Sequence, residues 1–253
     1  MNLLEVRELT IENPKTKERL IKNISFDIKE PTILGVLGES GSGKSLLCKA
    51  ILGLLDTNLK LSGSIKLENI ELINNEKEIR KNFCVVLQEA LNAFNPLYTI
   101  QFHMLESIKY KKSEALKLCK EKLEKVGLKD TKKILKSYAH ELSGGQLQRI
   151  MIAIALLQNK KIIIADEPTS SLDSINQKEI INIFKNLNKT LIFVSHDLAL
   201  ISYLANDIIV LKHGEIAEQG EKNNIFYNPK NEYVKSLLDI QNNLSKEFIS
   251  CLK

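Results

Sequence analysis

Hydrophobic positions in the first third of the chain alternate with polar ones or cluster between turn residues, as in β-strands. Three such stretches are LLEVRELTIE (3–12), LIKNISFDI (20–28) and SGSIKLENIEL (62–72). Between the second and third, the apolar run TILGVLG (32–38) leads into a glycine loop, and KSLLCKAILGLL (44–55) has the spacing of an amphipathic helix. This region is therefore predicted to be rich in β-structure around one strand–loop–helix unit.

The middle of the chain, from about Glu89 to Lys160, has the spacing of helices. In one stretch, apolar residues recur at three- and four-residue intervals, at Leu116, Cys119, Leu123 and Val126. Ser113 is predicted to be the N-cap of this helix, and Gly127 its C-terminal stop. We therefore expect an inserted helical lobe.

The last part alternates strands with helices: KIIIAD (161–166), SINQKEIINIFKNL (174–187), TLIFVS (190–195) and DLALISYLA (197–205). DIIVLKHGEIAEQG (207–220) follows as a hairpin that turns at His213 and Gly214. Such alternation predicts an α/β fold with a mostly parallel sheet. Residues 1–88 and 161–253 are expected to form this core with a β subdomain, and residues 89–160 the helical subdomain.

Composition adds limits to this fold. The chain has 253 residues, 43% apolar and 26% charged, as in an ordinary globular protein. Its longest apolar run, IMIAIALL (150–157), is far shorter than the roughly 20 residues that span a bilayer. The N-terminus has no signal-peptide pattern. The net charge of +5 comes with dispersed lysines, which argues against nucleic acid as a partner. We expect a cytoplasmic chain that reaches a membrane only through partners.

The cysteines and histidines suggest no metal cage. Cys48, Cys84, Cys119 and Cys251 are scattered without a C-x-x-C spacing, so buried, reduced thiols are expected. The four histidines are equally dispersed.

The sequence GESGSGKS, from Gly38 to Ser45, fits the pattern G-x-x-x-x-G-K-[ST]. It lies between a predicted strand and a predicted helix, as phosphate-binding loops do. Glycines let backbone N–H groups curl around phosphate oxygens, and the helix start adds partial positive charge. Lys44 is placed to reach the β- and γ-phosphates, and the hydroxyl of Ser45 to hold Mg²⁺. The motif predicts a nucleotide site.

The run KIIIADEP (161–168) ends a predicted strand with two acids. Ligands of open α/β sheets bind at the carboxyl ends of the strands. Asp166 is predicted to orient Mg²⁺, and Glu167 to take a proton from an attacking water. A plain surface acid pair is the alternative.

Two weaker signals point to hydrolysis. His196 directly follows another predicted strand, where it can donate a hydrogen bond to a γ-phosphate, although a lone histidine there is more often structural. LSGGQ, from Leu142 to Gln146, opens a helix and offers a second phosphate contact.

Together, and in this order, these motifs resemble those of the ATP-binding subunits of ABC transporters, over nearly the whole chain. The resemblance implies a P-loop NTPase fold. In it, Gly38 to Ser45 would be the Walker A loop, and Asp166 and Glu167 the Walker B acids. The other motifs implied are the Q-loop residue Gln88, the signature Leu142 to Gln146, the D-loop ending at Asp173, and the switch histidine His196. It also implies a head-to-tail dimer that binds ATP and Mg²⁺.

The residues implied to contact nucleotide are Gly38, Glu39, Ser40, Gly41, Ser42, Gly43, Lys44, Ser45, Asp166 and Asp173, with Ser143, Gly144, Gly145 and Gln146 serving the partner subunit's nucleotide. Ser45, Gln88 and Asp166 are implied to hold Mg²⁺. Glu167, His196 and Gln88 are implied to be catalytic.

Within the family, three stretches look like the nickel and peptide importer branch: AFNPLYTI (93–100), the residues around the signature (134–156) and IFYNPKNEYVKSLL (225–238). Phe94 favours nickel-type subunits over peptide-type ones, which stay an open alternative. The single Cys251 near the end disfavours an iron–sulfur cluster.

This resemblance implies a heterodimer with a related ATPase subunit, two transmembrane permease subunits, and an external substrate-binding protein that acts through them. The chain would then lie at the cytoplasmic face of the membrane. The apolar residues of AFNPLYTI are expected to dock on a permease, so part of the surface around Phe94 and Leu97 should be exposed.

The chain departs from the family at two places. The position that often holds an adenine-stacking aromatic residue falls on about Asn13, so the preference for ATP over GTP stays open. KEPTI (29–33) lacks the usual glycine before the Walker A strand. The rival interpretations are a soluble ABC ATPase acting on nucleic acid or ribosomes, a P-loop kinase, and a nucleotide-binding regulator without turnover.

Overall fold

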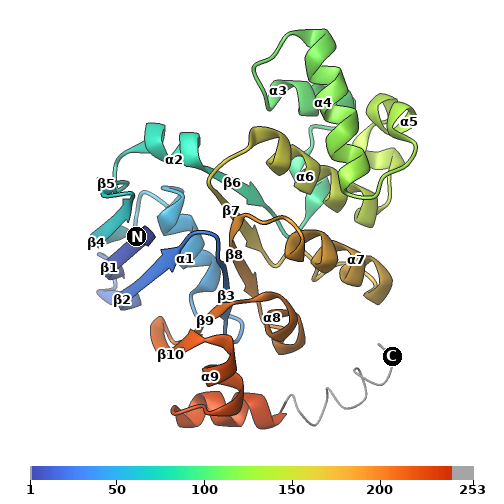
Figure 1. Ribbon diagram of the computed structural model, residues 1–253. Helices are drawn as coiled ribbons and strands as arrows, with labels where there is room; N and C mark the ends of the chain where they lie inside the picture. The colour runs from blue at the N-terminus through green and yellow to red at the C-terminus, as the bar shows by residue number, and fades with distance from the viewer. Residues whose placement is uncertain (1, 241–253) are drawn as a thin grey trace. The chain divides into compact units, whose positions relative to one another are not determined.

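The computed structural model describes residues 2–240 (Figure 1). They form two compact units. One contains residues 2–81 and 189–240, and the other is Asn82–Asn188. The two units are described in turn.

The first unit contains an antiparallel sheet with the strand order β2-β1-β4-β5. Its strands are β1 (Asn2–Asn13), β2 (Glu18–Lys29), β4 (Lys60–Leu67) and β5 (Ile70–Glu71). Leu4 and Val6 are buried with Glu5 between them, which is the alternation that the sequence predicted. The register shifts between Val6 and Leu9, so one face stays apolar along a long, bent strand.

The same unit holds four further strands, in the order β10-β9-β3-β8. They are β3 (Ile33–Leu37), β8 (Thr190–Ser195), β9 (Asp207–Lys212) and β10 (Glu215–Glu221). Strand β3 pairs in parallel with both β8 and β9, whereas β9 and β10 form an antiparallel hairpin. His213 and Gly214 turn this hairpin with φ of 49° and 79°, as predicted.

Short helices accompany these strands. They are α1 (Lys44–Ile51), α8 (Leu198–Leu204), α9 (Lys222–Tyr227) and α2 (Glu76–Asn82), the last of which the sequence pattern did not reveal. Helix α8 packs on β3 and β8. Gly35 allows this close approach, because a Cβ there would lie 2.9 Å from Cγ2 of Ile201.

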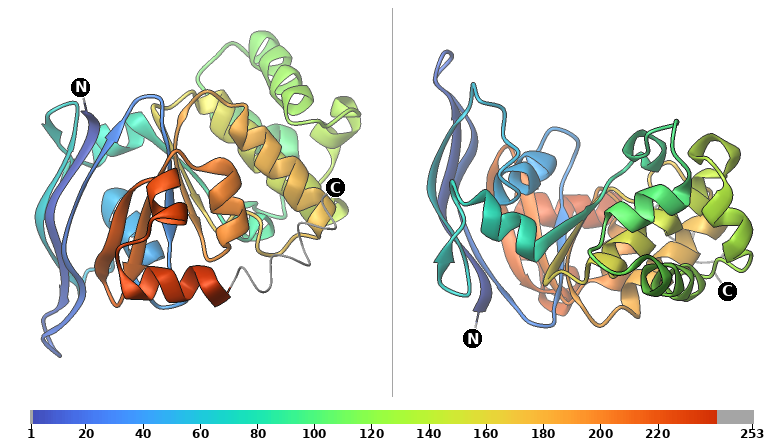
Figure 2. Two further views of the ribbon diagram at one scale, coloured as in Figure 1. Left: turned by 60° about the horizontal axis from the view of Figure 1, so that its bottom comes forward. Right: turned by 90° about the horizontal axis from the view of Figure 1, so that it is seen from above.

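The second unit is mainly helical. Its strands β6 (Phe83–Val86) and β7 (Ile162–Asp166) pair in parallel. Its helices are α3 (Ile100–Glu106), α4 (Lys112–Lys125), α5 (Thr131–Lys136), α6 (Gly144–Gln158) and α7 (Ser174–Lys185), with 3-10 turns η1 (Ala90–Ala93) and η2 (Ala139–Glu141). Helices α4 and α6 contact one another within this unit (Figure 2).

The α/β class with an additional antiparallel sheet is confirmed, and one local prediction is wrong. Lys111, not Ser113, is the N-cap of α4, because the chain turns into the helix two residues earlier. Gly127 does end the helix, with φ of 81° and its N–H donating to the Glu124 carbonyl. Cys48, Cys84 and Cys119 are buried thiols that form no disulfide, as predicted, and Cys251 lies outside the described residues.

Within residues 2–240, no helix has both the length and the apolar character needed to cross a membrane. That part of the chain also holds no group of three or more histidine, cysteine or acidic side chains suited to a metal ion.

Candidate functional site

The glycine loop of the first unit joins β3 to α1, as the sequence predicted. Gly43, the residue before α1, has φ of 104°. This left-handed conformation favours glycine, and a Cβ at this position would lie 2.7 Å from Cδ1 of Ile21, which would have to shift. The loop is thereby wrapped tightly against β2.

Lys44 is almost fully buried inside this loop, with 5% of its surface exposed. Its ammonium donates to the carbonyls of Gly38 at 2.8 Å and Glu39 at 2.9 Å. Oγ of Ser42 is also buried, and no hydrogen-bond partner for it occurs in the described part of the chain. A buried cation and an unsatisfied hydroxyl in a ring of backbone groups fit the oxygens of a phosphate chain.

His196 belongs to the same unit. The parallel register of β3 and β8 pairs Leu37 with Ser195, so the glycine loop and His196 leave the same edge of this sheet. Oγ of Ser195 accepts a hydrogen bond from the Asp197 N–H at 3.0 Å, and Asp197 caps α8 through the N–H groups of Ala199 and Leu200. These bonds fix the backbone on the C-terminal side of the exposed histidine.

The second unit holds the two acids. Strand β7 is buried from Ile162 to Ala165 and ends at Asp166, which is half-buried. Glu167 follows in a left-handed conformation, with φ of 45°. Its carbonyl accepts from both the N–H and the hydroxyl of Ser170, which stabilises this otherwise unfavourable turn. Such backbone strain is common at functional sites.

Gln88 follows β6 in this unit and is exposed. In the residue before it, Leu87, both the backbone N–H and the backbone carbonyl form hydrogen bonds to side chains of α6. Its carbonyl accepts from Nε2 of Gln148 at 3.0 Å, and its N–H donates to Sδ of Met151 at 3.0 Å. Since α6 begins at the predicted signature, one helix positions both Gln88 and the signature residues.

The predicted signature opens α6 with a capping box. Oγ of Ser143 accepts from the Gln146 N–H at 3.3 Å, and Oε1 of Gln146 accepts from the Ser143 N–H at 3.0 Å. The two glycines differ. Gly144 is exposed, whereas a Cβ on Gly145 would lie 2.5 Å from Oδ1 of Asn176. Only the first of them is open to a ligand.

Asp173 is the N-cap of α7. Its carboxylate accepts from the N–H groups of Ile175 and Asn176 and from the Asn176 amide. The backbone N–H of Asn176, followed by its amide, lowers the pKa of Asp173. The assignment of Asp173 to nucleotide binding stays a prediction, while its local structural role is clear.

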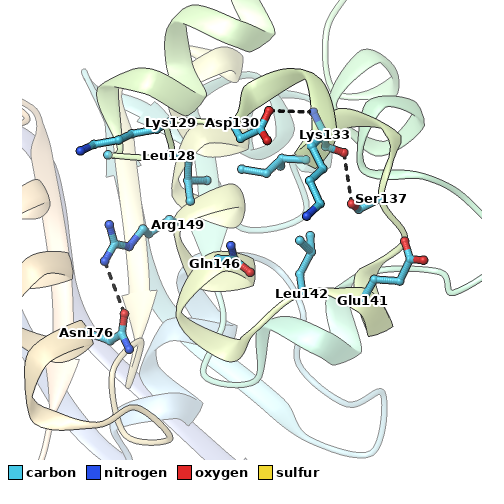
Figure 3. A pocket seen from close by; sticks show the side chains of 12 residues that line it. Leu128, Lys129, Asp130, Lys133, Ser137, Glu141, Leu142, Gln146, Arg149 and Asn176 are labelled. Carbon is cyan, nitrogen blue, oxygen red and sulfur yellow. Dashed lines mark hydrogen bonds between the residues drawn. The ribbon is translucent and has the colours of Figure 1, made fainter.

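A cavity of about 580 Å³ lies beside Leu142 and Gln146 of the signature (Figure 3). Arg149 of α6 donates to Oδ1 of Asn176 at 3.4 Å and forms an ion pair with Glu179 of α7. Burial lowers the pKa of Arg149. The cavity wall carries basic side chains, Lys129, Lys133 and Arg149, together with acidic ones, Asp130 and Glu141, so its charge is of both signs.

Comparison with known proteins bears directly on these motifs. A family model described as "ABC transporter" matches residues 21–170, more than half of the chain. The chain belongs to the ABC transporter family. Its ATPase domain binds and hydrolyses ATP, and Mg²⁺ is general for such ATPases. The resemblance seen in the sequence is therefore confirmed at the level of family, fold and enzymatic activity.

Among curated relatives, CntD, the ATP-binding protein of a metal–staphylopine import system of Staphylococcus aureus, is 38% identical, covering 98% of this chain and 96% of its own length. The dipeptide transport ATP-binding protein DppD of Haemophilus influenzae is 36% identical, covering 94% of this chain and 77% of its own.

Two solved structures share the fold of this ABC ATPase. Clostridium perfringens cbiO1, part of the transporter complex cbiONQ, superposes with a TM-score of 0.78 at 26% identity, covering 90% of this chain and 91% of its own. The ATP-binding cassette MJ0796, in a post-hydrolysis state with ADP and Pi, gives 0.74 at 30% identity, covering 87% and 98%.

Sequence reasoning missed the residues that support the motifs of this ABC ATPase. Gln148 is buried and pins the backbone before Gln88, but a lone glutamine within an apolar helix carries no pattern. The side chain of Asn176 leaves no room for a Cβ at position 145, but this contact between two helices cannot be read from the sequence. At the doubtful adenine position, Asn13 accepts from the N–H groups of Lys15 and Thr16 and so forms a turn.

Proposed function

We propose that this ABC ATPase powers the import of nickel or a metal–chelate complex. The observation that carries the proposal is the match to the metal–staphylopine import subunit over 98% of this chain, together with the full order of motifs. A dipeptide import subunit is nearly as similar, at 36% identity, so peptide import is the second candidate.

We assign the chemical steps to this chain's residues as follows. Lys44 gives up its bonds to the Gly38 and Glu39 carbonyls and turns to phosphate oxygens, so a buried charge stays paired throughout. Glu167 takes the proton of the attacking water, and His196 donates a hydrogen bond to the γ-phosphate. Mg²⁺, held by Ser45, Gln88 and Asp166, would neutralise charge on the phosphates.

The signature residues Ser143, Gly144, Gly145 and Gln146 serve the nucleotide of a second, related ATPase subunit. The exposure of Ser143 and Gly144 supports this assignment. Importer complexes contain permease subunits, and we assign two of them to this system, with an extracytoplasmic binding protein that delivers the cargo. The chain would then associate peripherally with the cytoplasmic face of the membrane.

An apolar surface after Gln88 supports docking on a permease. Leu97 is 79% exposed and Leu91 54%, and the rings of Tyr98 and Phe102, which are both exposed, stack with their centroids 4.1 Å apart. Phe94, in contrast, is only 6% exposed. The expected exposed apolar surface is therefore present at Leu97 but not at Phe94, which packs against the ring of His103. Exposed apolar clusters of this kind mark interaction sites.

Uptake by cells tests the cargo. Cells lacking this chain would be supplied with the wild-type chain or with Glu167→Gln, and uptake of radiolabelled nickel, with and without chelators, would be compared with that of a dipeptide. The variant should keep ATP binding and lower turnover by about a hundredfold or more, so it should abolish import as fully as the deletion. Loss of dipeptide uptake alone would replace the nickel proposal, and undiminished hydrolysis by Glu167→Gln would remove Glu167 as the base.

A further inference from the structure

The start of α6, which carries the signature, is packed unevenly. On one side, Leu142 and Gln146 line the cavity of about 580 Å³ described above, so this side has no closely packed neighbour. On another side, helix α7 approaches the backbone of Gly145. Oδ1 and Cγ of Asn176 would lie 2.5 Å and 2.7 Å from a Cβ at position 145, so the amide of Asn176 packs directly against this glycine.

The amide of Asn176 also reaches Asp173, the residue that ends the predicted D-loop. Its Nδ2 donates to Oδ2 of Asp173 at 2.6 Å. The other carboxylate oxygen, Oδ1, accepts from the backbone N–H groups of Ile175 at 3.1 Å and Asn176 at 2.9 Å. One side chain therefore bonds to the D-loop and lies against the signature.

Arg149 fixes the orientation of this amide (Figure 3). Its Nη2 donates to Oδ1 of Asn176 at 3.4 Å, and its guanidinium forms an ion pair with Glu179, one turn further along α7. Because Oδ1 accepts from Arg149 and Nδ2 donates to Asp173, a flipped amide would lose both hydrogen bonds. Since Arg149 belongs to α6, the helix of the signature, the amide is held by both helices.

The side chain of Asn176 is not needed to begin its own helix. The two backbone N–H groups that bond to Oδ1 of Asp173 would remain in Asn176→Ala, so α7 would keep its N-cap. The amide instead makes the contacts that relate α7 to α6. We propose that Asn176 is a positioning residue, which holds the signature and the end of the D-loop in one fixed arrangement so that both meet the partner subunit together. This role rests on the assignment of the signature to a second ATPase subunit.

The variant Asn176→Ala tests this role. In the whole chain, hydrogen exchange at the backbone amides of Ser143 and Gln146 should become about tenfold faster, because the start of α6 loses a packed neighbour. A merely structural role would instead raise exchange throughout the unit. In the complex isolated from cells through a tag on this chain, kcat for ATP should fall about tenfold, as for one lost hydrogen bond. The affinity of the isolated chain for Mg–ATP should change by less than about twofold.

Two further variants of α7 serve as comparison. Lys178→Ala is the matched control, because Lys178 is exposed on the same helix, and it should change none of these quantities. Asn176→Asp keeps the size of the side chain and an acceptor for Arg149, but it replaces the donor to Asp173 with an oxygen. If the bond to the D-loop matters, kcat should fall as far in Asn176→Asp as in Asn176→Ala.

The packing contact is tested by a double variant. Gly145→Ala places a Cβ against the amide of Asn176 and should lower the urea midpoint. In the Asn176→Ala background the space is free, so most of that loss should disappear. An undiminished loss in the double variant would overturn the proposal.

Two other results would also overturn it while leaving the import function untouched. They are unchanged exchange at Ser143 and Gln146 in Asn176→Ala, and full kcat in the isolated complex. A large loss of Mg–ATP affinity in the isolated Asn176→Ala chain is a different result. It would mean that the signature binds nucleotide within its own subunit, and it would overturn the assignment to a second subunit together with this role.

Discussion

The glycine loop and the signature both present the start of a helix, but they are built in opposite ways. Before α1, Gly43 adopts a left-handed conformation and provides no side-chain cap. Before α6, the side chains of Ser143 and Gln146 cap each other's backbone. A helix start without its own cap gains most from an anion, whereas a capped one is stable alone and can add a contact when an anion arrives.

The glycine loop is also more buried than the signature. Lys44 and Ser42 are buried in the loop, whereas Ser143 and Gly144 are exposed. We infer that the loop supplies most of the affinity of this subunit for nucleotide. The signature then contributes only when a partner subunit brings its own nucleotide.

The largest expected effect tests the loop side of this comparison. Lys44→Ala removes a buried cation that pairs with phosphate, so the affinity for Mg–ATP should fall at least about a hundredfold, as for loss of a buried charged pair. Lys49→Ala, on the exposed face of the same helix, is the control and should bind normally. Calorimetry on the whole chain measures both. Tight binding by Lys44→Ala would mean that the loop is not the main source of affinity.

A smaller effect distinguishes the two glycines of the signature. Gly145→Ala places a Cβ against Asn176, so it should lower the free energy of unfolding by about 1–3 kcal/mol through overpacking. At Gly144 the nearest atom would be 3.8 Å away, on Leu172, and Gly144→Ala should cost less than about 0.5 kcal/mol. Urea unfolding at constant pH measures both.

Neither glycine variant should change Mg–ATP affinity in the isolated chain by more than about twofold, if the signature acts only across a dimer. A large loss of affinity in Gly144→Ala would show that the signature binds nucleotide within one subunit.

The smallest effect concerns the cap of α7. The pKa of Asp173 is lowered by the N–H and amide of Asn176, so its carboxylate stabilises the folded state above the ordinary aspartate pKa of about 3.9. That contribution is lost as the pH falls through the lowered folded value. Urea midpoints of the wild type and Asp173→Asn should therefore differ slightly at neutral pH and converge in acid. A difference that grows in acid would contradict the cap.

Sequence patterns located most of the elements because each rests on local chemistry. The alternation of Leu4 and Val6, the turn at His213 and Gly214 and the stop at Gly127 all follow from the preferences of a few neighbouring residues. The N-cap of α4 was predicted at Ser113 but lies at Lys111, because the choice of capping residue is a weak preference that the surrounding chain can override. Helix α2 was not predicted for a similar reason, because the local preferences of a single short helix are weak.

The candidate site divides in the same way. The glycine loop, the strand-end acids and the signature could be found from the sequence because phosphate chemistry needs those residue types at fixed spacing. Gln148 under Leu87 and Asn176 against Gly145 could not, since each acts through a contact between residues distant in the chain.

The sequence by itself determined the family, the ATP chemistry and the residues expected to perform it, because those depend on residue type and spacing along the chain. Only the tertiary structure decided which supports hold them. It placed the end of β8 level with the end of β3, and it bonded the backbone before Gln88 to α6. These relations arise from packing between distant segments, where burial and satisfied polar groups, rather than local preference, select the contact.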